Sequence, residues 1–385
     1  MTDQPRRKAA IVGIGATEFS TNSGRSEQRL AVEAILEALG DAGLSPDDID
    51  GIINSDYEPT NHIDVVNAMG LRNIRAYATI PHGGGSPCGT IAQAAMMVAS
   101  GECKCVLAYR SMNERSGHRY GSPEIPATFD GVYGLHAPYG LIVPGEWVAM
   151  HARRRMIEFG ETREQWANIP LTFRKHANRN PRAIFHEKEM TLEDYLRAPM
   201  LADPLCRLDY CLETDGAVAY IVTSAERART LGSIPAYIHA TAQAMGYPIW
   251  YQSNYYRESL TTASEMVATA KILWKKSGLT PRDIDVAQIY DHFTPAVLTA
   301  LEDMGFCEKG EAGEFVGEGR IGVDGDLPMN TAGGLLSEGY IHGWNLILEA
   351  VRQVRGTSTA QVKDVEFSLV TSCVGAPTSA AILSR

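Results

Sequence analysis

A glycine-rich stretch that carries reactive side chains runs from Asn330 to Gly343, and a helical pattern follows it at once. Four glycines fall within eleven residues, and Tyr340 and His342 stand between them. This spacing predicts a tightly bent backbone that presents side chains and amide groups at the N-terminus of a helix, where polar groups of a ligand can bind. Taken alone, the stretch is equally compatible with a glycine-rich hairpin or a helix cap.

Three other stretches combine glycines or strand ends with hydroxyl, imidazole or thiol groups. They are Gly83–Gly89, Tyr290–Phe293 and Ser372–Gly375. Such groups can exchange protons with a substrate only where the fold brings them to one place. We expect the four stretches to converge if the chain consists of two similar halves that pack face to face.

An internal repeat supports two similar halves. Residues 42–50 match residues 277–285 at a constant offset of 235 residues, with six identities in nine positions, and in each copy an amphipathic helix precedes and a strand follows. The helices that open at Gly89 and Gly343 also correspond, since each follows a glycine-rich turn and precedes an apolar strand. The pattern predicts two α/β halves related by a pseudo-two-fold axis.

The segment between these halves has a different character. The chain of 385 residues is longer than the roughly 250 to 300 residues that one core usually supports. Residues 111–214 are partly helical and are typical of a loop or lid domain over a site, whereas the strand Ala217–Val222 belongs to the first core. We therefore divide the chain into an N-terminal half (1–110 plus 215–260), a loop domain (111–214) and a C-terminal half (261–385).

Composition indicates an ordinary globular protein, with 44% hydrophobic and 21% charged residues. The net charge of −11 argues against nucleic acid as the main partner. No apolar run is long enough to span a membrane and the start is not a signal sequence, so we expect a cytoplasmic protein. The seven cysteines include no Cys-x-x-Cys pair, which predicts reduced thiols and no structural metal.

The duplicated halves, the interposed domain and the four stretches in this order resemble the thiolase superfamily over essentially the whole chain. The resemblance is greatest to its lipid-transfer-protein-like branch, in which a His-Asp-Cys-Phe type stretch stands where Tyr290–Phe293 stands here. It implies an α/β, thiolase-like fold of five layers (αβαβα) with a loop domain.

The sequence departs from the thiolase pattern at the reactive positions. The thiolase nucleophile is a cysteine, and the corresponding residue here is Ser86. The histidine that activates this cysteine corresponds to Tyr340, and the Asn or His of the second stretch corresponds to Tyr290. Only Cys373 keeps the family's acid/base position, and the glycine triplet after it has become Gly375-Ala376-Pro377.

The loss of the nucleophile and the gain of two tyrosines is similar to the bacterial steroid side-chain-cleaving aldolases. That resemblance implies a retro-aldol cleavage of a 17-hydroxy-20-carboxyl-CoA steroid to a 17-ketosteroid and propionyl-CoA, without an acyl-enzyme. The reaction then needs a group that takes the hydroxyl proton, donors that stabilise the thioester enolate and a proton source for its α-carbon. Tyr290, Tyr340 and Cys373 together would supply these, and the sequence leaves open which tyrosine is the base and which the acid. Coenzyme A is part of the substrate and no other cofactor is implied. The implied partners are a second copy of the chain and a small OB-fold, acyl-CoA-associated protein.

Other positions of the same stretches are expected to contact the substrate: His292, His342, Ser86, Gly334 and Gly375. Each candidate also has a structural interpretation. A strand-end tyrosine often serves only as a hydrogen-bonding residue, Cys373 can be a buried thiol, and the two histidines can simply orient their neighbours.

Two further patterns and two other functions remain open. The run Arg153–Arg155 is either a solvated helix face or a contact for coenzyme A phosphates, and the aromatic stretch Met245–Tyr256 either walls an apolar pocket or forms a dimer interface. The protein can also be a true thiolase that uses Ser86 or a displaced Cys88, or a non-catalytic scaffold that binds acyl-CoA or lipid.

Overall fold

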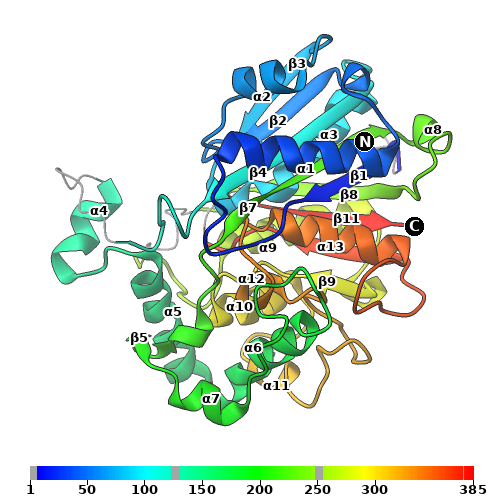
Figure 1. Cartoon of the computed structure of the whole chain (residues 1–385). Coiled ribbons are helices and arrows are strands. Elements are labelled where there is room, and N and C mark those ends of the chain that lie inside the picture. Colours follow the sequence, from blue (N-terminus) through cyan, green and yellow to red (C-terminus); the bar gives the residue numbers. More distant parts are fainter. Residues whose placement is uncertain (1–6, 123–130, 248–254, 376) are drawn as a thin grey trace.

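The computed structural model describes residues 7–122, 131–247, 255–375 and 377–385, and its main feature is a nine-stranded mixed sheet (Figure 1). The strands lie in the order β3-β2-β4-β7-β1-β8-β11-β10-β9. Their bounds are β1 Ala9–Ala16, β2 Gly51–Ser55, β3 Ala76–Ile80, β4 Cys105–Asn113, β7 Asp215–Ser224, β8 Ala236–Ala244, β9 Val286–Gln288, β10 Phe367–Thr371 and β11 Thr378–Ser384. The first five strands of this order form one half of the molecule, and the last four form the other.

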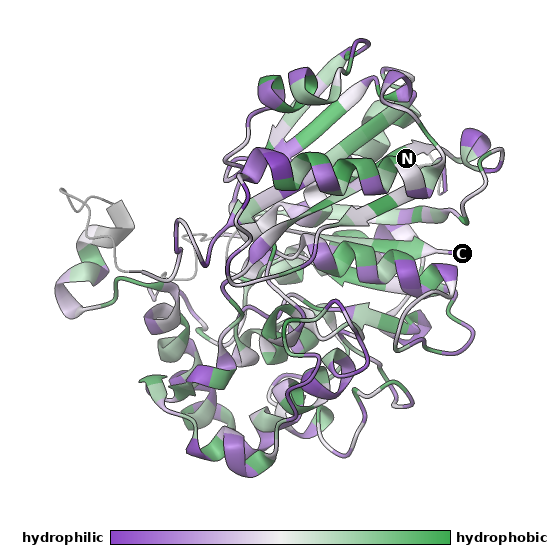
Figure 2. Ribbon diagram, in the orientation of Figure 1, coloured by the Kyte–Doolittle hydropathy of each residue, from purple (hydrophilic) through white to green (hydrophobic). Residues whose placement is uncertain are grey.

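Two buried helices lie between the halves. Helix α3 (Pro87–Ala99) contacts strands of both halves, and so does α13 (Trp344–Arg355). Helices α1 (Glu27–Ala42) and α2 (His62–Met69) cover the first half, while α9 (Ser264–Ser277) and α10 (Thr294–Met304) cover the second. Figure 2 shows hydrophobic residues gathered in the strands and on the inner helix faces. The predicted five-layered α/β arrangement is thus confirmed.

The repeated sequence forms the same structure twice. Each copy is a helix that ends at a left-handed glycine, Gly43 (φ 65°) or Gly278 (φ 69°), and continues through a 3-10 turn to a strand. The turns are Pro46–Asp48 and Pro281–Asp283. In both, a proline begins the turn, and the closing aspartate accepts hydrogen bonds from the residue before the proline. Local turn chemistry therefore explains three of the six identities: the glycine, the proline and the closing aspartate.

Strand β8 groups with the second half by its hydrogen-bond pairing. It pairs with β11 at seven positions and with β1 at only two. Strand β7, by contrast, lies between β1 and β4, as predicted for the strand that returns to the first core. Residues 236–244 fall in the segment that the sequence analysis placed in the N-terminal half, yet β8 opens the second half as β1 opens the first.

The loop domain packs below the second half in Figure 1, where α5 and α6 contact α10, and α6 also contacts α12 (Gly334–Ser337). Its elements are α4 Gly131–His136, 3-10 turns Ala137–Tyr139 and Arg207–Asp209, α5 Pro144–Phe159, α6 Arg163–Ala177, α7 Leu192–Arg197, and a hairpin of β5 Met200–Ala202 and β6 Leu205–Cys206.

The two halves contain further short elements: α8 Ala225–Ala228, α11 Ala312–Phe315 and a 3-10 turn at Gly83–Gly85. No helix of the described ranges has the length and apolar character needed to cross a membrane.

The arginine run on α5 is neither a uniformly solvated face nor an open phosphate site. Arg155 is fully buried and forms ion pairs with Glu161 and Glu302. Arg153 pairs with Asp203, and the neighbouring Arg154 with Glu158 four residues later. Because burying a guanidinium is costly unless it is paired, Arg155 ties the loop domain to α10.

Candidate active site

Two parallel strands deliver the reactive stretches to one edge of the sheet. Strand β10 pairs with β9 in parallel, so the residues after both strands lie side by side. Tyr290 and His292 follow β9, and Cys373 follows β10. The Tyr290 amide donates a hydrogen bond to Oγ1 of Thr371 at 3.1 Å, which fixes the two strand ends relative to each other.

The glycine-rich stretch is held against this edge by Asn330 and Asp291. The Asn330 side chain accepts from the Ile289 amide at 2.7 Å and donates to the Ile289 carbonyl at 2.8 Å. Asp291 accepts from the amides of Leu335 and Leu336. A Cβ atom at Gly334 would lie 2.3 Å from Oδ2 of Asp291, so Gly334 faces this carboxyl group. Burial raises the pKa of Asp291 to about 7 despite these hydrogen bonds.

The two tyrosines meet at the centre of the site. Their hydroxyl oxygens lie 3.1 Å apart, and Tyr290 and Tyr340 are 2% and 9% exposed. Burial raises the pKa of both phenols well above the ordinary value, so both are neutral at physiological pH. A Cβ atom at Gly343 would lie 2.5 Å from the Tyr290 ring, which explains a glycine at the start of α13.

Cys373 and His292 lie beside the tyrosine pair. The Cys373 sulfur is 3.5 Å from Nε2 of His292 and 3.0 Å from the Val374 carbonyl oxygen. Burial lowers the pKa of His292 to about 3, so its ring is neutral. The other half of the molecule contributes Gly84, whose carbonyl oxygen accepts from the Cys373 amide at 2.8 Å. The four stretches therefore converge, as the duplication predicted.

Neither candidate thiolase nucleophile is available for attack. Ser86 is 1% exposed and its hydroxyl donates to the Gly83 carbonyl at 2.6 Å. Cys88 is fully buried, and burial raises the pKa of its thiol to about 12. The residue of this turn that faces the tyrosines is Gly84, because a Cβ atom there would lie 2.4 Å from the Tyr290 hydroxyl.

His342 lies at the first half's side of the site, where its Nδ1 is 2.9 Å from a guanidinium nitrogen of Arg110. Arg110 is fully buried in β4 and pairs with Glu58. Glu114, just after the same strand, is 4% exposed, and burial raises its pKa to about 8. The sequence analysis did not identify Arg110, Glu58 or Glu114. The usable signal was Arg110 itself, a charged residue that directly follows the apolar run Val106–Tyr109.

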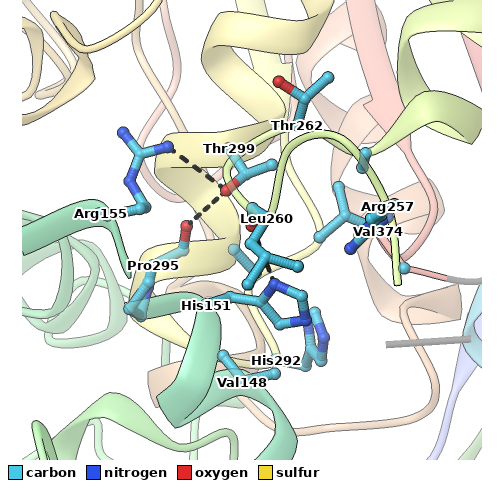
Figure 3. A pocket seen from close by; sticks show the side chains of 13 residues that line it. Val148, His151, Arg155, Arg257, Leu260, Thr262, His292, Pro295, Thr299 and Val374 are labelled. Atoms are coloured by element: carbon cyan, nitrogen blue, oxygen red, sulfur yellow. Dashed lines mark hydrogen bonds between the residues drawn. The ribbon is translucent and has the colours of Figure 1, made fainter. Parts of the chain in front are cut away.

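A small pocket of about 40 Å³ adjoins the site on the side of the loop domain (Figure 3). His292 and Gly375 form part of its wall, and α5 and the start of α10 complete it through Val148, His151, Pro295 and Ala296. The wall is mainly apolar, and of its two arginines, Arg155 and Arg257, the first is paired with Glu161 and Glu302. The pocket therefore gives the loop-domain side of the site a mainly apolar surface next to His292.

The aromatic stretch Met245–Tyr256 lies largely outside the described residues, since 248–254 are not described. Of the rest, Tyr247 and Tyr256 are 91% and 72% exposed, and the Tyr255 hydroxyl donates to the Trp147 carbonyl. The choice between a pocket wall and a dimer interface stays open.

Comparison with known proteins agrees with this geometry. Residues 246–385 match a family described as "Thiolase C-terminal domain-like". The chain is 47% identical to a steroid side-chain-cleaving aldolase of Thermomonospora curvata (97% of each chain covered) and 49% identical to a 17-hydroxy-3-oxo-4-pregnene-20-carboxyl-CoA lyase of Mycobacterium tuberculosis (98% and 99%). A solved structure described as an Ltp2-ChsH2(DUF35) aldolase matches with a TM-score of 0.94 and 46% identity over 99% of this chain and 98% of that one. The chain therefore belongs to the thiolase superfamily, in the branch of the steroid side-chain-cleaving aldolases.

Proposed function

We propose that this protein is a thiolase-like carbon–carbon lyase. It cleaves the β-hydroxyacyl-CoA side chain of a 17-hydroxy-20-carboxyl-CoA steroid to a 17-ketosteroid and propionyl-CoA, without an acyl-enzyme. The observation that carries this proposal is the 3.1 Å contact between the Tyr290 and Tyr340 hydroxyls, at positions where thiolases hold residues that serve a nucleophilic cysteine. The names of the two relatives support the same reaction class.

The two phenols can move the proton that the reaction requires. Cleavage breaks the bond between the tertiary carbinol carbon and the α-carbon, the alcohol becomes a ketone, and the electron pair enters the thioester as an enolate. The alcohol proton passes to one phenolic oxygen, that phenol passes its own proton to the other across the 3.1 Å contact, and the second phenol protonates the α-carbon. Each tyrosine ends with as many protons as it began with.

Such a relay suits phenols that stay neutral. Because burial raises the pKa of both Tyr290 and Tyr340, neither can serve as a pre-formed phenolate base at neutral pH. A concerted relay avoids a charged phenolate in a buried site. Cys373 and His292, 3.5 Å apart beside the tyrosine pair, are the groups we assign to contacting the substrate and to supplying a second proton donor.

Two other functions are weaker. A thiolase would need an activated nucleophile, whereas Ser86 donates its hydroxyl to Gly83 and Cys88 is buried as a thiol. A non-catalytic acyl-CoA or lipid scaffold would have no use for two buried phenols in contact. Iodoacetamide separates the three: it should abolish a thiolase, affect this lyase much less, and find no turnover in a scaffold.

The proposed partners are a second copy of the chain and a small OB-fold, acyl-CoA-associated protein. Strand β3 forms one end of the sheet order, and beside it Tyr77 and Ile63 are 74% and 71% exposed, which suits burial in a homodimer. Light scattering with Tyr77→Glu, compared with wild type, tests the dimer. Co-expression and co-purification test the OB-fold partner.

A CoA thioester substrate also supports a cytoplasmic location.

The direct test is incubation with a 17-hydroxy-20-carboxyl-CoA steroid, with and without the OB-fold protein. Stoichiometric release of the 17-ketosteroid and propionyl-CoA is expected. Formation of acetyl-CoA from acetoacetyl-CoA and free coenzyme A would instead favour a thiolase.

A further inference from the structure

The hydrogen bond between Arg110 and His342 determines where the imidazole proton lies. A guanidinium group carries only donors, so the atom that faces it at 2.9 Å, Nδ1 of His342, must be the acceptor. A neutral imidazole has one acceptor nitrogen and one donor nitrogen. The ring proton of His342 therefore lies on Nε2.

Arg110 is fixed so firmly that it cannot easily turn away. Its guanidinium lies 3.2 Å from Oε2 of Glu58, and both side chains are fully buried. Glu58 is held in turn by the Ser111 amide at 2.7 Å, and Arg110 also donates to the Tyr120 hydroxyl at 3.2 Å. The Arg110 charge is thus balanced, and its donor toward His342 is held in place.

His342 stays neutral beside this cation. Burial, and then the charge of Arg110, lower the pKa of His342 well below the ordinary value. The rings of Tyr57, Tyr120 and Tyr340 pack around the imidazole, and the carboxylate of Glu58 pairs with the same Arg110. His342 can therefore act neither as an imidazolium acid nor, through Nε2, as a base.

The backbone conformation at His342 indicates that this position has a functional role. Its φ of +48° is in the left-handed region that side chains rarely adopt, and Gly343 follows at +78°. Non-glycine residues persist in this region where surrounding contacts fix them, commonly at functional sites. The ring lies edge-on to Tyr340 with centroids 5.2 Å apart, and within the described ranges no hydrogen bond engages Nε2.

We propose that His342 is a catalytic residue whose neutral Nε2–H donates a hydrogen bond to the thioester oxygen as the enolate forms, and that Arg110 is the positioning residue that fixes this tautomer. The proposal rests on the proposed function above. His342 transfers no proton: the electrons of the broken carbon–carbon bond reach the thioester oxygen, Nε2–H stabilises them there, and the tyrosine relay protonates the α-carbon. A neutral donor suits this task because it keeps its proton.

The first test compares two amides. In His342→Gln the amide nitrogen reaches the place of Nε2, whereas in His342→Asn it reaches only the place of Nδ1. We expect Gln to retain kcat within about tenfold, and Asn to lose about 10² to 10³ in kcat with KM little changed, the usual effect of removing one oxyanion donor. His62→Gln, a histidine of α2 away from the site, serves as the control and should keep wild-type kinetics. Equal activity of the Gln and Asn variants would overturn the proposal.

The second test needs no turnover. In ¹⁵N-labelled enzyme, the signal that disappears in His342→Gln should show a single Nε2–H tautomer between pH 6 and 9. In Arg110→Met, which removes the donor that faces Nδ1, the Nδ1–H tautomer should become visible and kcat should fall with KM little changed. An Nδ1–H or imidazolium signal in the wild type overturns the inference even if the enzyme cleaves its steroid substrate. Absence of steroid cleavage with the expected tautomer would instead refute the proposed function.

Discussion

The Tyr290 hydroxyl packs against the backbone of Gly84 so closely that a Cβ atom at position 84 would lie 2.4 Å from it. The same Cβ would be 3.1 Å from that of Cys373. The two halves of the molecule thus meet across the Tyr290 phenol. Position 84 needs a glycine because a side chain has no room there, and not because of its backbone φ angle.

Gly84→Ala should therefore displace the Tyr290 hydroxyl from Tyr340 while the protein stays folded. A misplacement of about 1 Å can reduce turnover by roughly 10²-fold, and we expect a loss of this order in kcat. Gly40→Ala in α1 is the matched control, because a Cβ there meets nothing within 4 Å. Wild-type kcat in a folded Gly84→Ala variant would show that the position of Tyr290 is not critical.

No acyl-enzyme should form. The Ser86 hydroxyl is occupied by Gly83, and the pKa of the Cys88 thiol is raised to about 12, so neither group attacks a thioester at neutral pH. Intact mass after incubation with acetyl-CoA or acetoacetyl-CoA should equal that of the untreated protein, with a thiolase as the positive control. A stable adduct on Ser86 or Cys88 would support a thiolase.

Glu114 should make the protein less stable as the pH rises. Burial raises its pKa to about 8 in the folded state, whereas in the unfolded state it titrates near 4.5. Between these values the folded state binds more protons than the unfolded state, so the free energy of unfolding falls by about 1.4 kcal/mol per pH unit. The loss is complete above pH 8, and below pH 4.5 the group contributes nothing.

Glu114→Gln removes this titration. Relative to wild type, its free energy of unfolding should rise by roughly 2 to 4 kcal/mol between pH 5.5 and pH 8, as measured by urea unfolding. Glu226→Gln, at an exposed position at the start of the short helix α8, provides the comparison variant. Parallel stability curves for wild type and Glu114→Gln would mean that this carboxyl group ionises normally.

The sequence predicted the duplicated fold because its signals are local. The Gly–Leu–Ser/Thr–Pro turns are specified by caps within a few residues, and the order of the four glycine-rich stretches identified the edge where they meet. Tyr290, Tyr340 and Cys373 could be placed from their neighbours in the chain.

The remaining features depend on distant contacts. Nothing near Arg110 in the sequence indicates that it meets His342, which lies 232 residues away, and Gly84 faces Tyr290 across the two halves. The burial of Arg155 depends on Glu302 from α10, so an arginine run on an amphipathic helix was easily read as a surface feature. Strand β8 could be assigned to its half only from its pairing with β11.

The measurement that tests the relay most directly is a double-mutant cycle on the tyrosine pair. Tyr340→Phe and Tyr290→Phe each keep the ring and remove one hydroxyl of the 3.1 Å contact, so each should reduce kcat by about 10² to 10⁴ with KM nearly unchanged. Because one missing hydroxyl already interrupts the relay, the double variant should lose little more than either single variant. Multiplicative losses, or near-wild-type turnover in Tyr340→Phe, would contradict the account.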